Sequence, residues 1–307
     1  MTDLIILGAG TAGLTAAIYG ARAGLSIKII EKSFFGGQII STTSIENYPG
    51  MPGIHGAEFA TALYNQAKSL GAEILYETIQ FAQLTGDIKQ ITTSKGVHQA
   101  KAVVIATGAK PKKLGVPGED KFTGRGVGFC VTCDGALYKE KATAVIGGGN
   151  VAIEDALILS DLCRTVTVIH RSTDFTAERI QLDISKTKTN IQFITNTIVK
   201  EFVGDETLEK VTVENTSSGQ ISDIPIDGVF IAIGAEPDSS LFAHELSLDE
   251  MGYVIADENC LTNLPGVFVA GDVRTKRIRQ IVTATADGSV AALAAKEYLM
   301  HDQNRLK

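Results

Sequence analysis

Two strand-like runs each end in a glycine-rich turn that opens a helix, and these units predict an α/β protein with two Rossmann-like nucleotide-binding domains. The first unit begins at Leu4 and the second at Ala144. The end of the chain, after about residue 242, contains one buried-type strand and one helix, too little to form a domain alone. We therefore predict that the second domain is inserted into the first.

The first unit consists of a strand at 4–7, the glycine turn, a helix of small residues over about 11–23, and a strand at 26–30. This order of elements is a βαβ unit. The same order returns with a strand at 144–146, a helix over about 150–162 and a strand at 166–170. Two such units indicate two domains.

Two further strand-like runs, at 102–106 and 228–233, precede segments rich in turn-forming residues. These segments, at 110–118 and after Gly234, predict linkers. The final segment contains a strand at 266–270 and an alanine-rich helix over about 283–299. The predicted domains are residues 1–112 with 242–307, and residues 116–238.

Composition and charge narrow the class of protein. Hydrophobic residues make up 44% and charged residues 21% of the 307 residues, as in an ordinary globular protein. The net charge of −7 argues against nucleic acid or an anionic membrane as the partner, because both select basic patches. The residues before Leu4 have no basic or long apolar region, so we expect no secretory signal. No apolar run approaches the roughly 18 to 20 residues that span a bilayer. We expect a soluble, cytoplasmic protein.

The first glycine turn, at residues 8–13, has the sequence Gly-Ala-Gly-Thr-Ala-Gly. The first glycine allows a tight turn, the second allows a pyrophosphate to approach the backbone, and the third allows close packing of helix and strand. Glu31 ends the next strand, where a carboxylate can accept hydrogen bonds from a free ribose diol. The turn therefore favours FAD, although a glycine turn can also serve packing alone.

The second glycine turn, at residues 147–152, has the sequence Gly-Gly-Gly-Asn-Val-Ala. The strand that follows ends in His170-Arg171-Ser172 and so offers a cation where the first unit has a carboxylate. A cation suits a 2′-phosphate, so this turn favours NADPH over NADH. The alternative is that Arg171 is a solvated surface residue.

Cys130 and Cys133 form a CxxC pair, while Cys163 and Cys260 stand alone. Such a pair can be a redox dithiol, half of a zinc site, or incidental. Zinc needs about four ligands and the chain has no second pair, so we expect no metal. Asp134 places a carboxylate next to the pair, where it can move the proton that dithiol chemistry requires. The two lone cysteines are expected to be buried small hydrophobes.

Several segments in order along the chain resemble those of the low-molecular-weight thioredoxin reductase family. The central one is Cys-Val-Thr-Cys-Asp-Gly at 130–135, preceded by Gly-Arg-Gly-Val at 124–127. The others are Gly-Gly-Gln at 36–38, Glu-Asn-Tyr-Pro-Gly at 46–50, and Gly-Asp-Val at 271–273 with Arg279-Gln280. The resemblance covers nearly the whole chain.

The resemblance implies that FAD lies in the discontinuous domain, 1–112 with 242–307, and that the NAD(P)-binding domain, 116–238, carries the cysteine pair. Electrons would pass from the nucleotide to FAD, then to the Cys130–Cys133 disulfide and to thioredoxin. Cys133 would face the flavin, Cys130 would attack the protein disulfide, and Asp134 would be the general acid/base. The residues expected at FAD are Gly8, Gly10, Thr11, Ala12, Gly13, Glu31, Lys32, Gly36, Gly37, Gln38, Asn47, Thr107, Gly108, Asp272, Arg279, Gln280 and Ile281. Those expected at the nicotinamide nucleotide are Gly147, Gly149, Asn150, Val151, Ala152, His170 and Arg171.

The family also implies a homodimer whose domains rotate against each other, with hinges near 111–117 and 234–242.

One segment departs from the family pattern. Members that use NADPH usually carry arginines where this chain has Ser172 and Thr176. The donor is therefore open between NADPH, NADH and ferredoxin, and a small-molecule dithiol oxidase on the same scaffold is a further alternative.

Overall fold

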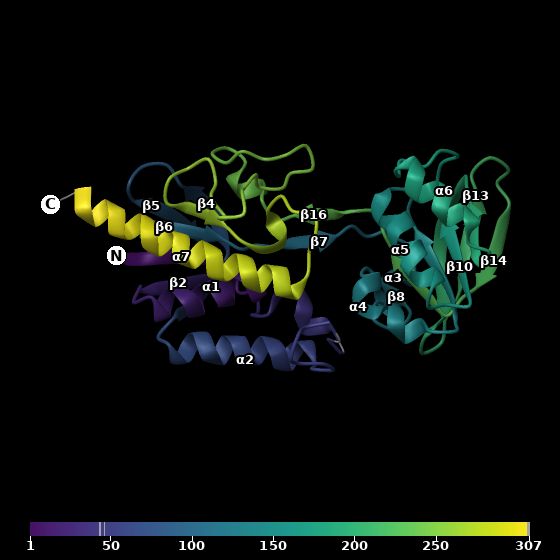
Figure 1. Ribbon diagram of the computed structural model, residues 1–307, viewed down its shortest axis with the longest axis horizontal. Helices are drawn as coiled ribbons and strands as arrows, with labels where there is room; N and C mark the ends of the chain where they lie inside the picture. The colour runs from purple at the N-terminus through teal and green to yellow at the C-terminus, as the bar shows by residue number, and fades with distance from the viewer. Residues whose placement is uncertain (43, 46, 306–307) are drawn as a thin grey trace. The chain divides into compact units, whose positions relative to one another are not determined.

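The computed structural model describes residues 1–42, 44–45 and 47–305. The chain divides into two compact units, Met1–Lys110 with Glu236–Lys307, and Pro111–Ala235 (Figure 1). The chain leaves the first unit after Lys110 and returns to it at Glu236. The two connecting segments, β7 (Ala109–Pro111) and β16 (Ala235–Pro237), pair with each other as short strands.

The first unit is built on a seven-stranded sheet in which β3, β2, β1, β6, β5 and β4 follow one another and β17 also pairs with β6. The strands around β1 are parallel, and Ile6 lies opposite Ile29 and Val104. The run from Leu4 to Leu7 is fully buried because both faces of this sheet are covered. The strands are β1 (Thr2–Leu7), β2 (Ile27–Glu31), β3 (Glu73–Tyr76), β4 (Ile79–Gln83), β5 (Lys89–Thr93), β6 (Gly96–Ile105) and β17 (Val267–Val269).

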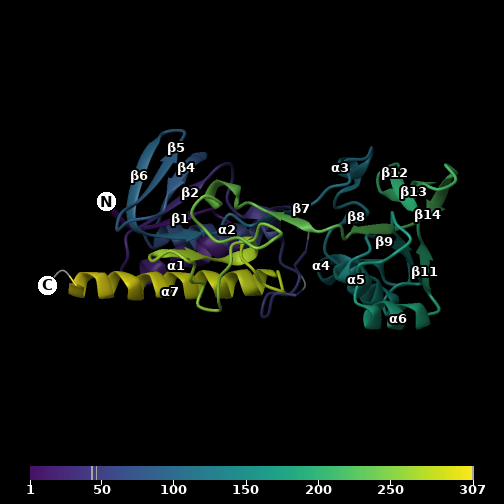
Figure 2. The ribbon, with the colours of Figure 1, turned by 90° about the horizontal axis from the view of Figure 1, so that it is seen from above.

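In the described part of the first unit, three helices pack with the sheet: α1 (Thr11–Arg22), α2 (Gly56–Ser69) and α7 (Ile281–Arg305). α7 runs along α1 in both views (Figures 1 and 2). A Cβ at Gly288 would lie 2.3 Å from the carbonyl oxygen of Ala12, so this glycine permits the close approach of the two helices. Short 3₁₀ turns are η1 (Gly37–Ser41), η3 (Ser240–Phe242) and η4 (Gly271–Val273).

The second unit contains a parallel five-stranded sheet in the order β11, β10, β9, β15, β8, and an antiparallel three-stranded sheet. The parallel strands are β8 (Val127–Gly128), β9 (Ala142–Ile146), β10 (Thr165–Ile169), β11 (Ile191–Ile194) and β15 (Gly228–Ile231). The antiparallel strands are β12 (Thr197–Gly204), β13 (Leu208–Asn215) and β14 (Ile221–Pro225). The helical segments are α3 (Glu119–Phe122), α4 (Val131–Asp134), η2 (Gly135–Tyr138), α5 (Asn150–Ser160) and α6 (Arg179–Thr187).

The predicted α/β class is confirmed, and the strands and helices next to both glycine turns agree with the prediction to within a few residues. Within the segment predicted as a linker at 110–118, the structure has the end of β7, which was not predicted from the sequence. β7 is a strand because it pairs with β16, a partner so distant in sequence that no local pattern reveals it. No helix in the described part of the chain is long and apolar enough to cross a membrane.

Candidate active site

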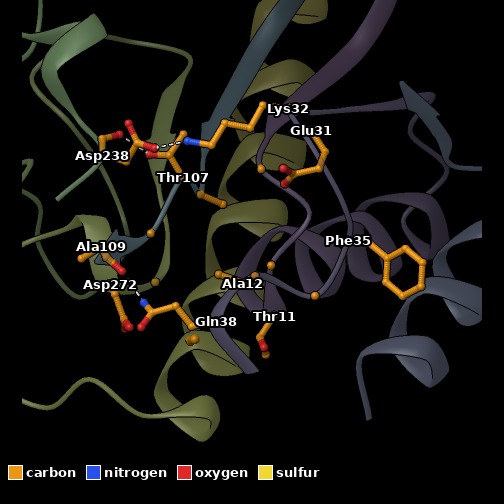
Figure 3. Close-up of a pocket in the computed structure, with 18 of the residues that line it drawn as sticks. Thr11, Ala12, Glu31, Lys32, Phe35, Gln38, Thr107, Ala109, Asp238 and Asp272 are labelled. Atoms are coloured by element: carbon orange, nitrogen blue, oxygen red, sulfur yellow. Dashed lines mark hydrogen bonds and ion pairs between the residues drawn. The ribbon is translucent and has the colours of Figure 1, made fainter. Parts of the chain in front are cut away.

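A cavity of about 600 Å³ lies in the first unit, where the N-terminal end of α1 meets the ends of β2 and β6 (Figure 3). Its walls come from segments that are far apart in the sequence. The predicted FAD residues that line it are Gly8, Gly10, Thr11, Ala12, Glu31, Lys32, Gly36, Gly37, Gln38, Thr107, Gly108, Asp272, Gln280 and Ile281.

The three glycines of the first turn have different surroundings. Gly8 has φ +106°, and a Cβ there would lie 2.5 Å from the carbonyl oxygen of Ala106. A Cβ at Gly13 would lie 1.9 Å from the carbonyl oxygen of Gly8, so the packing at this position requires a glycine. At Gly10 the nearest atom to a Cβ is Gly37 Cα, at 4.0 Å. Gly10 is therefore the position at which a ligand can come close to the backbone.

Glu31 fixes the turn to the end of β2. Its carboxylate accepts hydrogen bonds from the backbone nitrogens of Ala9, at 2.9 Å, and Ser33, at 3.1 Å. The adjacent Lys32 forms an ion pair with Asp238, with 2.6 Å between Nζ and Oδ2 (Figure 3). Asp238 also lines the cavity but was not predicted, because it lies just after β16 and belongs to no glycine motif.

Two buried polar atoms in the cavity wall have no hydrogen-bond partner among the described residues. They are Thr11 Oγ1, at the N-terminal end of α1, and Asp272 Oδ1. Burial raises the pKa of Asp272, an effect that the nearby Lys276 and Arg279 oppose. Buried polar groups are normally paired, so these two atoms mark places where a ligand completes the hydrogen bonding. A threonine hydroxyl and a helix N-terminus suit a diphosphate, and a carboxylate oxygen suits a sugar-like hydroxyl. The cavity thus fits FAD.

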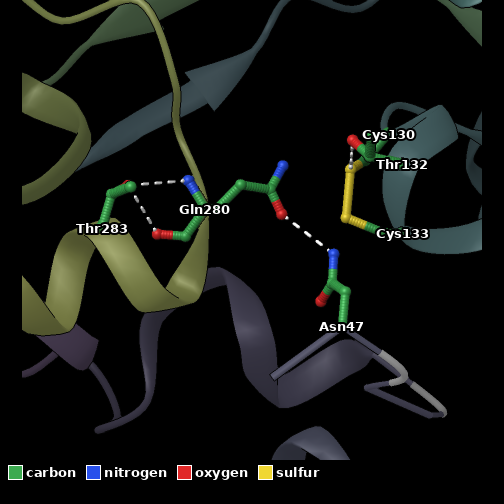
Figure 4. Close-up of a disulfide and its surroundings, with 6 residues drawn as sticks. All are labelled: Asn47, Cys130, Thr132, Cys133, Gln280 and Thr283. Carbon is green, nitrogen blue, oxygen red and sulfur yellow. Dashed lines mark hydrogen bonds between the residues drawn. A yellow bond between two sulfur atoms is a disulfide. The ribbon is translucent and has the colours of Figure 1, made fainter. Parts of the chain in front are cut away.

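Three predicted FAD residues, Gly13, Asn47 and Arg279, lie outside the cavity wall. Asn47 Nδ2 donates to Gln280 Oε1 at 3.0 Å, which joins two of the family-like segments (Figure 4). The guanidinium of Arg279 lies over the ring of Tyr253, 3.9 Å from its centre. Glu46, in the first of these segments, lies outside the described residues.

The second glycine turn connects β9 to α5. The ring of His170 covers Gly148, since a Cβ on that glycine would lie 2.2 Å from His170 Cε1. The carbonyl oxygen of Gly148 accepts from the backbone nitrogen of Thr176 at 2.9 Å and from its hydroxyl at 3.3 Å. Asn150 Oδ1 accepts from the backbone nitrogen of Glu178 at 2.7 Å.

The segment after β10 therefore folds against this turn and brings Thr176 beside it. Of the other residues predicted here, Arg171 and Val151 are exposed, while Gly147 and Ala152 are buried. Gly147 has φ +153°, a left-handed conformation, and a Cβ there would lie 2.4 Å from the carbonyl oxygen of Ala232. The N-terminal end of α5, with Gly149 as its cap residue, offers backbone N–H groups of the kind that bind phosphates.

Cys130 and Cys133 are joined by a disulfide at the start of α4, with 5.3 Å between their Cα atoms (Figure 4). Cys130 Sγ lies 3.5 Å from the hydroxyl of Thr132. The carbonyl oxygen of Cys130 accepts from the backbone nitrogen of Asp134 at 3.1 Å, which keeps Asp134 in the same turn. Burial raises the pKa of the Asp134 carboxyl. The pair thus has a carboxyl group in the same turn that holds a proton more tightly than an exposed aspartate does.

The other two cysteines are buried free thiols, as predicted. Cys163 packs in the core of the second unit. Burial raises the pKa of Cys260 to about 12, so this thiol is not a nucleophile at neutral pH. Within the described part of the chain, no group of His, Cys, Asp and Glu side chains is arranged to hold a metal ion.

Comparison with known proteins identifies the relatives of this chain. Residues 2–288 match the family described as pyridine nucleotide-disulphide oxidoreductase. A thioredoxin reductase from Listeria innocua is 41% identical, with 97% of this chain and 93% of that protein covered. The "34.2 kDa protein in rubredoxin operon" of Clostridium pasteurianum is 42% identical, with 97% of each covered.

Solved structures lead to the same family. The thioredoxin reductase of Streptococcus pyogenes is 40% identical and has a TM-score of 0.94, with 98% of this chain and 99% of that chain covered. The Cys130–Cys133 disulfide fits the redox pair of such enzymes. The chain therefore belongs to the low-molecular-weight thioredoxin reductases, flavoenzymes of the pyridine nucleotide-disulphide oxidoreductase family.

Proposed function

We propose that this protein is an FAD-dependent reductase that carries two electrons from a nicotinamide donor to the Cys130–Cys133 disulfide and then to thioredoxin or a thioredoxin-like protein. The disulfide carries the proposal, because a partly buried carboxyl lies in the same turn and the unit also contains a nucleotide-type glycine turn. We further propose that the protein acts as a homodimer in the cytoplasm, where thiols are kept reduced.

The cavity of the first unit is the proposed FAD site. Thr11 and the backbone near Gly10 would hold the diphosphate at the N-terminal end of α1, and Glu31 would hold the adenosine ribose. Asp272 would accept a hydrogen bond from a hydroxyl of the ribityl chain. Bound FAD supplies a carrier that accepts two electrons from a nicotinamide and passes them to a disulfide.

The cysteines would perform the exchange with the protein substrate. The Cys130 thiolate attacks one sulfur of the substrate disulfide, whose S–S bond breaks, and the leaving thiolate takes a proton. The Cys133 thiolate then attacks Cys130 Sγ, which releases the second substrate thiol and re-forms the Cys130–Cys133 disulfide. Asp134 would hold the proton that each leaving thiolate takes up, because its raised pKa lets it act as an acid.

We propose separately which molecule donates the electrons. An intact glycine turn at α5 supports a nicotinamide nucleotide, and Arg171 next to His170 supports NADPH. NADH or a small iron protein such as ferredoxin is the second candidate. Ser172 and Thr176 provide no cation for a 2′-phosphate, and the Thr176 hydroxyl faces the carbonyl oxygen of Gly148. The relative from C. pasteurianum is named for its place in a rubredoxin operon.

Anaerobic mixing of the oxidised holoenzyme with each donor separates these candidates. We expect NADPH to bleach the visible absorption of the flavin, and the Arg171→Gln variant to bind NADPH about tenfold more weakly because a charge-assisted contact is lost. NADH should react equally with both enzymes, which makes it the control. Bleaching by reduced ferredoxin but by neither nucleotide would overturn the nicotinamide assignment.

A further inference from the structure

Behind the cavity lies a buried cluster of charged residues: Asp287 on α7, Arg274 and Lys276. The Asp287 carboxylate accepts from Arg274 Nε at 2.9 Å, from its second guanidinium nitrogen at 3.0 Å, and from Lys276 Nζ at 2.6 Å. The side chains of Asp287, Arg274 and Lys276 are only 8%, 4% and 8% exposed. None of the three lines the cavity, and none belongs to a motif that predicts a role.

The same carboxylate is bonded to the turn that carries Asp272. Asp287 Oδ2 accepts from the backbone nitrogen of Gly271 at 2.9 Å. Gly271 has φ +79°, a conformation that favours glycine, and a Cβ there would lie 2.9 Å from Ala12 Cβ. The turn is therefore held both by its contact with α1 and by Asp287.

Among the described residues, one buried oxygen of Asp272 has no hydrogen-bond partner, although the charges of Lys276 and Arg279 oppose the rise in pKa that burial causes. A lysine ammonium next to an unpaired buried carboxylate would normally pair with it. Each of the two cations is engaged elsewhere. Lys276 is bonded to Asp287 and, at 3.4 Å, to the carbonyl oxygen of Thr283. Arg279 lies over Tyr253 and donates to the carbonyl oxygen of Asp272 at 3.3 Å.

We propose that Asp287 is a positioning residue of the FAD cavity, which anchors the Gly271 turn and holds Lys276 away from the Asp272 carboxylate. Asp272 then stays free to accept a hydrogen bond from a cofactor hydroxyl. Loss of the negative charge at Asp287 would release Lys276 to pair with Asp272, and the cofactor would have to break that pair. This inference rests on the proposed FAD site.

The Asp287→Asn variant tests the idea because the amide oxygen can still accept from Gly271 N while the charge is lost. The measurement is the dissociation constant of FAD, from quenching of flavin fluorescence on titration into apoprotein. We expect a rise of about tenfold or more, the value of one charge-assisted hydrogen bond. In the double variant Lys276→Met/Asp287→Asn, we expect the constant to return to within about threefold of the wild type, because the competing cation is gone. A purely structural role of Asp287 gives no such rescue.

Glu245→Gln is the matched control, since this carboxylate also accepts a backbone N–H, from Leu84, but does not line the cavity. FAD affinity should not change in this variant. Unchanged affinity in Asp287→Asn, or a double variant that binds FAD no more tightly than the single one, overturns the inference. If Asp287→Asn does not fold, the FAD affinity of Lys276→Met is the test. A loss of about tenfold in that variant would show that the lysine itself supports the cofactor, which overturns the inference. Failure of the wild type to bind FAD would instead contradict the proposed function.

Discussion

Asp134 and Asp272 show how the same residue type can serve two chemical purposes. Burial raises the pKa of both carboxyls. Asp272 has cations nearby that favour its ionised form, which suits a hydrogen-bond acceptor. Burial is the effect that shifts Asp134, which suits a group that holds and releases a proton. The difference lies in the charged neighbours of each carboxyl.

Replacing Asp134 with asparagine should separate catalysis from stability. We expect the turnover of thioredoxin reduction to fall about a hundredfold, within the range of a lost general acid. Steady-state kinetics with saturating donor measure this change. Asp161→Asn is the control, because Asp161 is 71% exposed and its ion pair with Lys188 lies on the surface. Full activity of Asp134→Asn would contradict the assignment.

The same variant should change how stability depends on pH. Since burial raises the pKa of Asp134 above its unfolded value, the folded state binds the proton more tightly, and this group destabilises the fold as pH rises. Asp134→Asn should therefore melt at a higher temperature than the wild type near pH 7. The gain should vanish below about pH 3, where the carboxyl is protonated in both states. A pH-independent difference would mean that burial of this charge is not the cause.

At the scale of elements, the glycines of the turn between β1 and α1 have two different roles, packing and space for a ligand. Gly13 is packed against a carbonyl oxygen, whereas Gly10 faces the cavity. We expect Gly13→Ala to destabilise the first unit by about 1–3 kcal/mol through overpacking. Gly10→Ala should leave the melting temperature of the apoprotein unchanged but weaken FAD binding at least about tenfold, because the methyl group occupies cofactor space. Equal effects of the two alanines on melting and on FAD binding would contradict this division.

Elements next to glycine turns could be predicted from the sequence, whereas those defined by distant partners could not. The β1–α1 and β9–α5 units were predicted because a tight turn, a helix start and a buried strand each leave a local pattern. The pairing of β7 with β16 leaves no such pattern. The same holds for the site. The glycine turns and Asp272 belong to recognisable segments, but Asp238 and Asp287 reach the cavity region only through tertiary contacts.

At the scale of the whole molecule, the two units differ in how the chain builds them. The second unit is continuous, Pro111–Ala235, and contains two hydrophobic clusters of its own. The first unit needs both ends of the chain, because β17 and α7 complete its sheet and its helical layer.

An isolated fragment of residues 111–235 should therefore fold. We expect a cooperative thermal transition by circular dichroism and formation of the Cys130–Cys133 disulfide on oxidation. A fragment of residues 1–110 lacks β17 and α7 and should not melt cooperatively. The account would be contradicted if the 1–110 fragment folds cooperatively. It would also be contradicted if the 111–235 fragment does not fold cooperatively.

Thioredoxin-dependent oxidation of the donor, compared in the wild type and in cysteine variants, tests the central claim most directly. The Cys133→Ser variant should retain FAD but lose at least about a hundredfold in turnover, because the relay from flavin to substrate is broken. Cys163→Ala, which removes a buried free thiol from the same unit, should keep wild-type activity. If Cys133→Ser reduces thioredoxin as fast as the wild type, the Cys130–Cys133 disulfide is not the path of the electrons.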